Sequence, residues 1–287
     1  MGKKGGIKLL ISDKVREYAG ELMERERSEN TVKKYLRDLG KLMEYAGDSP
    51  LDKALLVSFK HSLAEKYSPS SVNSIIAAVN GFLDFAGMSS LRLKPLKIQR
   101  RAFLPEEREL TLGEYKRLVS AAERGSDERL ALVLQTLCAT GIRVSELKFI
   151  TAEAVRGGRA LISCKGKSRV VFLPEKLQKI LAKYLKKRGI REGAVFVTRS
   201  GVPLDRSNIW REMKRLCRSA GVAEKKVFPH NLRHLFARTY YSLEKDLSRL
   251  ADILGHSAVN TTRIYTMESG KIHAKQINRL GLVLDTT

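Results

Sequence analysis

Five residues in three short segments of the second half of the chain have types and spacings suited to catalysis. Arg143 follows a Thr-Gly-Ile segment at the start of a predicted helix. His230 and Arg233 stand three residues apart, so they share one face of another predicted helix. His256 follows a Leu-Gly helix ending, and Tyr265 lies nine residues after it. Such residues serve as proton carriers, as a nucleophile and as cations that stabilise an anionic transition state.

A lysine joins this set from the predicted turn of a β-hairpin. Lys165 is the first candidate, and Lys167, two residues further on, is the second. Taken singly these signals are weak, because Arg-x-Ser-Glu is commonly a surface ion pair, His-x-x-Arg is commonly structural, and Tyr265 is one of nine tyrosines. Their joint occurrence in this order is much more specific. His234, which follows Arg233 directly, is interpreted as a packing residue.

The segments around these positions resemble the tyrosine recombinase family, which includes lambda-type phage integrases and the Xer recombinases. Ala-Thr-Gly-Ile-Arg-Val-Ser-Glu-Leu matches the family's first box at Arg143. His-Asn-Leu-Arg-His matches the second box at His230 and Arg233. Leu-Gly-His-Ser-Ala-Val-Asn-Thr-Thr-Arg-Ile-Tyr-Thr matches the last box at His256 and Tyr265. The resemblance implies a mainly α fold: an N-terminal helical SAM-like DNA-binding domain, then a mixed α/β catalytic domain with a small antiparallel sheet.

The resemblance also implies an activity, the cutting and rejoining of DNA at specific sites. Tyr265 would attack a phosphodiester and form a 3′-phosphotyrosyl bond, which conserves the bond energy for rejoining. Attack adds charge to the nonbridging oxygens, and Arg143 and Arg233 would stabilise it because a guanidinium group binds two phosphate oxygens.

The remaining roles follow from the same resemblance. Lys165 would protonate the leaving 5′ oxygen, His230 would act as acid or base toward the tyrosine, and His256 would donate a hydrogen bond to the phosphate. Glu146, three residues after Arg143, is a further candidate for orienting a catalytic partner. We expect no metal or nucleotide cofactor, because the carboxylate cluster of a metal-dependent nuclease is missing from the sequence.

These residues must be positioned by a domain that starts near residue 110. Apolar alternation predicts strands over 159–164 and 169–173, joined by a turn at 165–168. Thr111 is the expected cap of the first helix of this domain. Helical spacing predicts helices over 112–124, 126–138, 175–188, 207–220, 231–242 and 247–254.

The first third of the chain predicts four short helices with many lysines. Ser28 or Asn30 is expected to cap the second helix, and Ser68 to Ser71 the fourth. We therefore divide the chain into a DNA-clamping domain at 1–90, a basic linker at 91–109 and a catalytic domain at 110–287.

Composition supports a polyanionic partner. The chain has 54 Lys and Arg against 31 Asp and Glu, a net charge of +23, which favours nucleic acid through release of its counterions. Three scattered cysteines argue against a disulfide framework or a zinc site. No apolar run approaches the roughly 20 residues that span a bilayer, so the cytoplasm is the expected location.

Several alternatives stay open at this stage. A type IB topoisomerase resembles this family in its chemistry, a mobile-element integrase would share all of these motifs, and a DNA-binding architectural protein would share the fold. Within the family, the chain length and the absence of an extra arm-binding domain point to the Xer subgroup, for which resolution of chromosome dimers at a fixed site is the expected role. The expected partner is double-stranded DNA carrying a recombination site, bound by a homotetramer that holds two duplexes. An apolar stripe predicts a last helix over 271–284 for contact between subunits.

Overall fold

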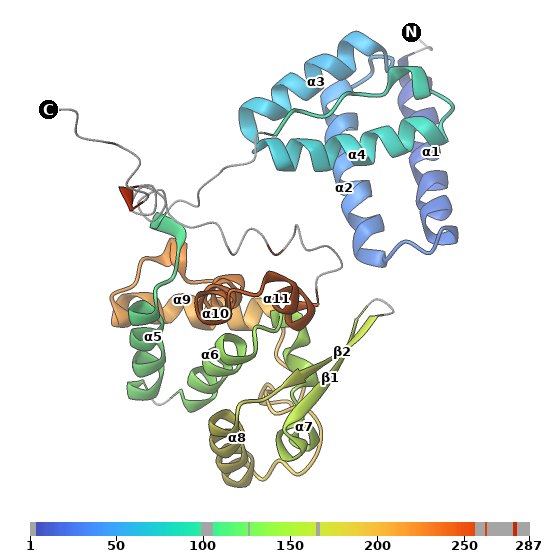
Figure 1. Cartoon of the computed structure of the whole chain (residues 1–287). Coiled ribbons are helices and arrows are strands. Elements are labelled where there is room, and N and C mark those ends of the chain that lie inside the picture. The colour runs from blue at the N-terminus through green and yellow to red at the C-terminus, as the bar shows by residue number, and fades with distance from the viewer. Residues whose placement is uncertain are drawn as a thin grey trace, which may run out of the picture. The chain divides into compact units, whose positions relative to one another are not determined.

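The computed structural model describes residues 4–98, 106–125, 127–164, 167–255, 262 and 278–279. The chain forms two compact units, Met1–Arg100 and Arg101–Thr287 (Figure 1). Each unit has its own hydrophobic core, so each is described by itself.

The first unit is a bundle of helices around a small apolar core. Ser28 and Ser68 cap the second and fourth helices, as their spacing predicts, because each hydroxyl accepts a hydrogen bond from a main-chain N–H three residues later. Leu56 and Val79 lie fully buried at the centre of this bundle. Its helices are α1 (Lys4–Glu24), α2 (Glu29–Ala46), α3 (Lys53–Lys66), α4 (Pro69–Phe85) and the short 3-10 helix η1 (Ser89–Leu91).

The segment after this bundle is bound to the last long helix. The amides of Asn80 and Asn73 on α4 each exchange two hydrogen bonds with main chain, at Leu93 and Leu96 respectively. Each amide thus pairs with both the N–H and the carbonyl of one residue. The extended chain that follows η1 is therefore bound to the first unit at least as far as Leu96.

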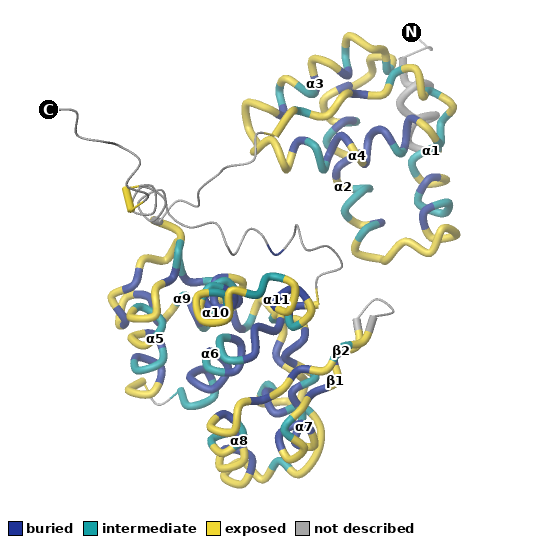
Figure 2. The backbone as a smooth tube through the Cα atoms, in the orientation of Figure 1, coloured by how far each residue is buried: buried dark blue, intermediate teal, exposed yellow. Residues whose placement is uncertain are grey.

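The second unit is also mainly helical, and most residues of its central helix are buried (Figure 2). Thr111 and Glu114 form a reciprocal capping box at the start of α5, as the position of Thr111 predicts. Its described elements are η2 (Glu106–Arg108), α5 (Leu112–Arg124), the central α6 (Glu128–Thr140), η3 (Val144–Phe149), α7 (Ala152–Gly157), β1 (Arg159–Cys164), β2 (Lys167–Phe172), α8 (Glu175–Arg188), α9 (Arg206–Ala220), η4 (Glu224–Lys226), α10 (Pro229–Glu244) and α11 (Leu247–Leu254).

Several predicted boundaries were wrong by two residues, including both ends of the helices expected over 126–138 and 231–242, which span Glu128–Thr140 and Pro229–Glu244. The helix expected from residue 126 starts at Glu128, because the Asp127 side chain accepts a hydrogen bond from Leu130 N and so caps it. The second strand begins at Lys167 rather than Arg169, since Lys167 pairs with Cys164 across the hairpin. Only two residues therefore separate the strands.

The hairpin has one buried and one exposed face. Ala160, Ile162 and Val171 are at most 5% exposed, whereas Leu161 and Phe172, on the other face, are 65% and 74% exposed. Arg169 pairs with Ile162 in the register and so lies on the buried face. An isolated two-stranded sheet is marginal in water, so this hairpin depends on the helices that cover its inner face.

The expected fold class, mainly α with a small antiparallel sheet in the second domain, agrees with these elements. Within the described residues, no helix is both long and apolar enough to cross a membrane.

Candidate active site

Arg143 lies in the turn between the buried helix α6 and the 3-10 helix η3. It is the N-cap residue of η3, and its side chain is 42% exposed. The sequence placed this arginine at the start of a new helix, and the structure has that helix in the shorter 3-10 form. A partly exposed guanidinium group in this position can reach an anionic ligand.

The turn before Arg143 depends on a glycine. Gly141 ends α6 with φ +63°, a left-handed conformation that favours glycine. A Cβ at this position would lie 2.4 Å from Cδ1 of Phe236, a residue of α10. α10 can therefore pack closely against the end of α6, and Figure 1 shows these two helices side by side near the centre of the unit.

His230 and Arg233 lie in the first two turns of α10. Pro229 occupies the first helical position, where its lack of an N–H costs nothing. Asn231 is buried, and its side-chain amide donates to the carbonyl oxygens of Arg108 and Lys226 at 2.8 and 2.7 Å. These bonds fix the start of α10 on η2 and η4, and hence the positions of both predicted residues.

Arg233 is 1% exposed and binds main chain at two helix ends. Its Nη1 donates to the carbonyl oxygen of Gly141 at 2.6 Å, and its Nη2 donates to that of Leu254 at 2.7 Å. The carboxyl ends of helices carry partial negative charge, which favours a cation there. Arg233 thus joins α6, α10 and α11, and the last of these leads directly to His256 in the sequence.

A buried carboxylate next to Arg143 receives two arginines. Glu146 is 1% exposed and accepts hydrogen bonds from Arg143 N at 2.7 Å and from Arg143 Nη1 at 2.9 Å. Arg169 of β2 binds the same carboxylate through Nη1 and Nη2, at 2.9 and 2.8 Å. Burial raises the pKa of the Glu146 carboxyl, but the hydrogen bonds from Arg169 and Arg143 outweigh it and hold the pKa below 4.5.

The contact between Glu146 and Arg143 is the one that an orienting role for Glu146 requires. The sequence analysis did not single out Arg169. Its inward position on a short strand can be recognised only once the register of the hairpin is known.

His230 lies among positive charges. Its pKa is lowered from 6.5, first by burial and then by the charges of Arg233, Arg143 and Arg206. Its imidazole therefore stays neutral at neutral pH, the form that accepts a proton. Arg206, the first residue of α9, was also missed, since nothing in the sequence brings it near the His-x-x-Arg segment.

His234 packs against His230, as a packing role predicts. The two rings meet edge to face, with centroids 4.6 Å apart. Burial and the charges of His230, Arg238 and Arg233 lower the pKa of His234 to about 3. His234 is therefore a neutral neighbour that supports one side of the His230 ring.

The structure brings together Arg143, His230 and Arg233 of the six predicted site residues. The other three, Lys165, His256 and Tyr265, lie outside the described residues. The same holds for the predicted terminal helix at 271–284, apart from residues 278–279.

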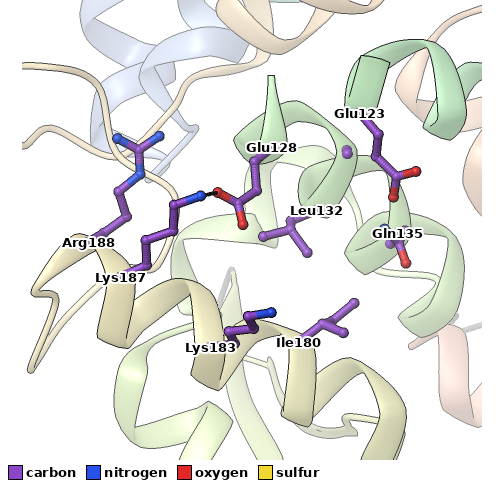
Figure 3. Close-up of a pocket in the computed structure, with 9 residues that line it drawn as sticks. Glu123, Glu128, Leu132, Gln135, Ile180, Lys183, Lys187 and Arg188 are labelled. Atoms are coloured by element: carbon purple, nitrogen blue, oxygen red, sulfur yellow. Dashed lines mark hydrogen bonds and ion pairs between the residues drawn. The ribbon is translucent and has the colours of Figure 1, made fainter. Parts of the chain in front are cut away.

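We also searched the described residues for a metal site and for pockets outside this cluster. In the described parts of the chain, no group of three or more His, Cys, Asp or Glu side chains is placed to hold a metal ion. An open pocket of about 580 Å³ lies between α6 and α8, where Lys187 Nζ binds Glu128 at 2.7 Å (Figure 3). Leu132 and Ile180 also line it, and it contains none of the predicted catalytic residues.

Comparison with known proteins adds independent findings. Residues 108–271 match the phage integrase family, and residues 15–88 match the SAM-like domain found at the N-terminus of phage integrases. The tyrosine recombinase XerA of Pyrococcus furiosus is 30% identical over 285 residues, which cover 96% of each chain.

Two solved structures share the fold. A crystal structure of the XerH site-specific recombinase bound to its difH substrate matches with a TM-score of 0.68 and 20% identity, over 93% of this chain and 84% of that one. A lambda integrase tetramer bound to a Holliday junction matches with a TM-score of 0.71 and 19% identity, over 89% of this chain and 76% of that one.

Proposed function

Because this chain belongs to the phage integrase family of tyrosine recombinases, we propose that it is an Xer-like recombinase that exchanges strands at a specific double-stranded DNA site. The observation that carries the proposal is the convergence of Arg143, His230 and Arg233. Arg233 of α10 binds the carbonyl oxygen of Gly141 at the end of α6, two residues before Arg143, which is the N-cap of η3. This cluster supplies two cations and a neutral imidazole, as attack on a phosphodiester requires.

The reaction assigned to the site has one covalent intermediate. Tyr265 Oη attacks the scissile phosphorus, the bond from phosphorus to the 5′ oxygen breaks, and a 3′-phosphotyrosyl bond forms. His230 accepts the phenolic proton, and Lys165 donates a proton to the leaving 5′ oxygen. His256 donates a hydrogen bond to a nonbridging oxygen. A 5′ hydroxyl from the partner strand then reverses these steps and releases the tyrosine.

Arg143 and Arg233 share the charge stabilisation unequally. Arg143 is partly exposed and can form a bidentate contact with phosphate oxygens. Arg233 is held by two carbonyl oxygens, so its guanidinium group adds positive charge from a fixed position. A preorganised charge needs no reorganisation during the reaction, which is the main advantage of an enzyme site over water.

We assign DNA clamping to the helical domain at 1–90 and chemistry to the domain at 110–287, joined by the basic linker at 91–109. Strand exchange needs two duplexes, so we propose a homotetramer with one subunit on each half-site. The related lambda integrase whose structure is a tetramer on a Holliday junction supports this assembly. The terminal segment 271–284 is our candidate for the contact between subunits.

Resolution of chromosome dimers at a fixed site is our preferred biological role. The similarity to a XerA recombinase over 96% of both chains supports it against integration of a mobile element. A type IB topoisomerase would use the same intermediate without pairing two sites, so relaxation of a plasmid that carries no recombination site would favour that alternative.

The proposal is tested with a nicked suicide substrate that traps the covalent intermediate. We expect the wild-type protein to form an adduct in the presence of EDTA, and the Tyr265→Phe variant to bind the same DNA without forming one. Tyr67→Phe, on the first unit, is the matched control and should form the adduct normally. An adduct from Tyr265→Phe at the wild-type yield would overturn the assignment, and cleavage that requires magnesium would point to a metal-dependent nuclease.

A further inference from the structure

The carboxylate of Glu146 lies in an environment that could easily weaken the active site. It is buried, carries a negative charge and directly contacts Arg143, the more exposed of the two candidate phosphate-binding arginines. If Arg143 were its only partner, the two charges would cancel each other. The guanidinium group would then have little net charge left for a phosphate.

Arg169 changes this balance. Its two terminal nitrogens each bind a different oxygen of Glu146, in the paired geometry that makes arginine–carboxylate contacts strong. Its side chain is 15% exposed, against 42% for Arg143. The buried arginine therefore matches the buried carboxylate, and of the three charges the one that faces solvent most is the positive charge of Arg143.

The position of Arg169 is also restricted by the end of helix α11. Gly255, which ends α11 with φ +66°, lies so close that a Cβ there would stand 2.8 Å from Cδ of Arg169. The preceding residue, Leu254, accepts a hydrogen bond from Arg233. Arg169 thus contacts Glu146 at one end and, along its aliphatic part, the helix end that is bound to Arg233.

We propose that Arg169 is a positioning residue of the active site, whose ion pair with Glu146 neutralises that carboxylate and leaves the charge of Arg143 available to the scissile phosphate. This inference rests on the proposed function. It assigns Arg169 no contact with DNA. On this proposal a residue of strand β2 sets the net charge around Glu146 and Arg143.

The first test measures adduct formation by Arg169→Gln with the nicked suicide substrate under single-turnover conditions. We expect a rate about 10-fold to 10²-fold lower, at or below the loss from removing one transition-state donor. Binding to intact DNA should change little. Arg159→Gln is the matched control, because Arg159 is an exposed arginine on the other face of the same hairpin. Arg169→Lys, which keeps the charge, should recover part of the lost rate.

Two further measurements separate an electrostatic role from a structural one. The double variant Glu146→Gln/Arg169→Gln removes both charges and should cleave faster than Arg169→Gln alone. A substrate with a neutral methylphosphonate at the scissile position needs less cationic stabilisation, so it should reduce the defect of Arg169→Gln to a few-fold or less.

The outcomes are distinct. If the wild-type protein forms no adduct, the proposed function itself fails. If the wild-type protein cleaves and Arg169→Gln cleaves equally well, the positioning role is wrong. A double variant no faster than Arg169→Gln, together with an undiminished defect on the methylphosphonate, would assign Arg169 to folding alone.

Discussion

The guanidinium group of Arg233 donates a 2.6 Å hydrogen bond to the carbonyl oxygen of Gly141, 92 residues earlier in the chain. Gly141 lies two residues before Arg143, so this hydrogen bond holds Arg233 close to the segment that carries Arg143. It also shows that the two arginines differ. Arg233 is buried and joins helix ends, whereas the side chain of Arg143 is partly exposed.

This difference predicts unequal effects on stability. Arg143→Ala and Arg233→Ala should each slow adduct formation by about 10²-fold or more, because each removes a charge that the proposed mechanism uses to stabilise the transition state. Arg233→Ala should also destabilise the fold by roughly 2–4 kcal/mol, since it leaves the carbonyls of Gly141 and Leu254 without that donor. Arg143→Ala should cost much less, because Glu146 keeps Arg169. Urea unfolding measures both, and equal losses of stability would contradict the distinction.

The lysine assignment has a chemical test. A lysine that protonates the leaving 5′ oxygen becomes dispensable when a bridging sulfur replaces that oxygen, because sulfur leaves without protonation. Lys165→Ala should therefore be inactive on normal DNA and active on the 5′-phosphorothiolate, while Lys167→Ala should be active on both. Rescue of Lys167→Ala alone would move the role to Lys167, which lies within strand β2.

The charges around His230 predict a specific dependence of rate on pH. If neutral His230 accepts the proton of Tyr265, the rate should fall in acid only below pH 6.5, since burial and the nearby arginines lower the pKa of His230. Arg206→Ala removes one of these positive charges, so the pKa should rise and the loss of rate should begin at a higher pH. Arg211→Ala, on the same helix, is the control. A pH–rate profile of Arg206→Ala that shifts toward acid would refute this account.

His234 predicts how stability depends on pH. Below pH 6.5 a histidine of the unfolded chain binds a proton, whereas folded His234, with a pKa of about 3, does not. The free energy of unfolding should therefore fall as pH decreases from about 6.5 toward 3. His234→Gln should make this slope less steep by up to about 1.4 kcal/mol per pH unit. Exposed His61→Gln is the control, and equal slopes for wild type and His234→Gln would exclude the effect.

Gly141 and Gly189 provide a matched pair for the packing of α10. Both end helices with φ near +65°, at +63° and +67°. A Cβ at Gly189 meets nothing within 4 Å, whereas at Gly141 it meets the ring of Phe236. Gly189→Ala should cost only the left-handed strain, about 1–2 kcal/mol. Gly141→Ala should cost roughly 1–3 kcal/mol more and slow cleavage. Similar unfolding midpoints would show that Phe236 yields easily.

Much of the local structure was determined by the sequence itself. Thr111 and Ser28 cap the helices that their spacing predicts, because a capping hydroxyl acts on N–H groups only a few residues away. The order of the boxes around Arg143, His230 and Arg233 was likewise readable, because residue type and short spacing define them. The hairpin was predicted from alternation, with its second strand misplaced by two residues.

Only the tertiary structure decided what these charged residues contact. Arg233 reaches carbonyls 92 and 21 residues away, and Arg169 reaches a carboxylate 23 residues away, across elements whose packing no local pattern specifies. With 54 lysines and arginines in the chain, residue type cannot show which ones turn inward. Burying a charge is costly unless it finds a fitted partner, and such partners are created by helix ends and strands that meet only when the chain folds.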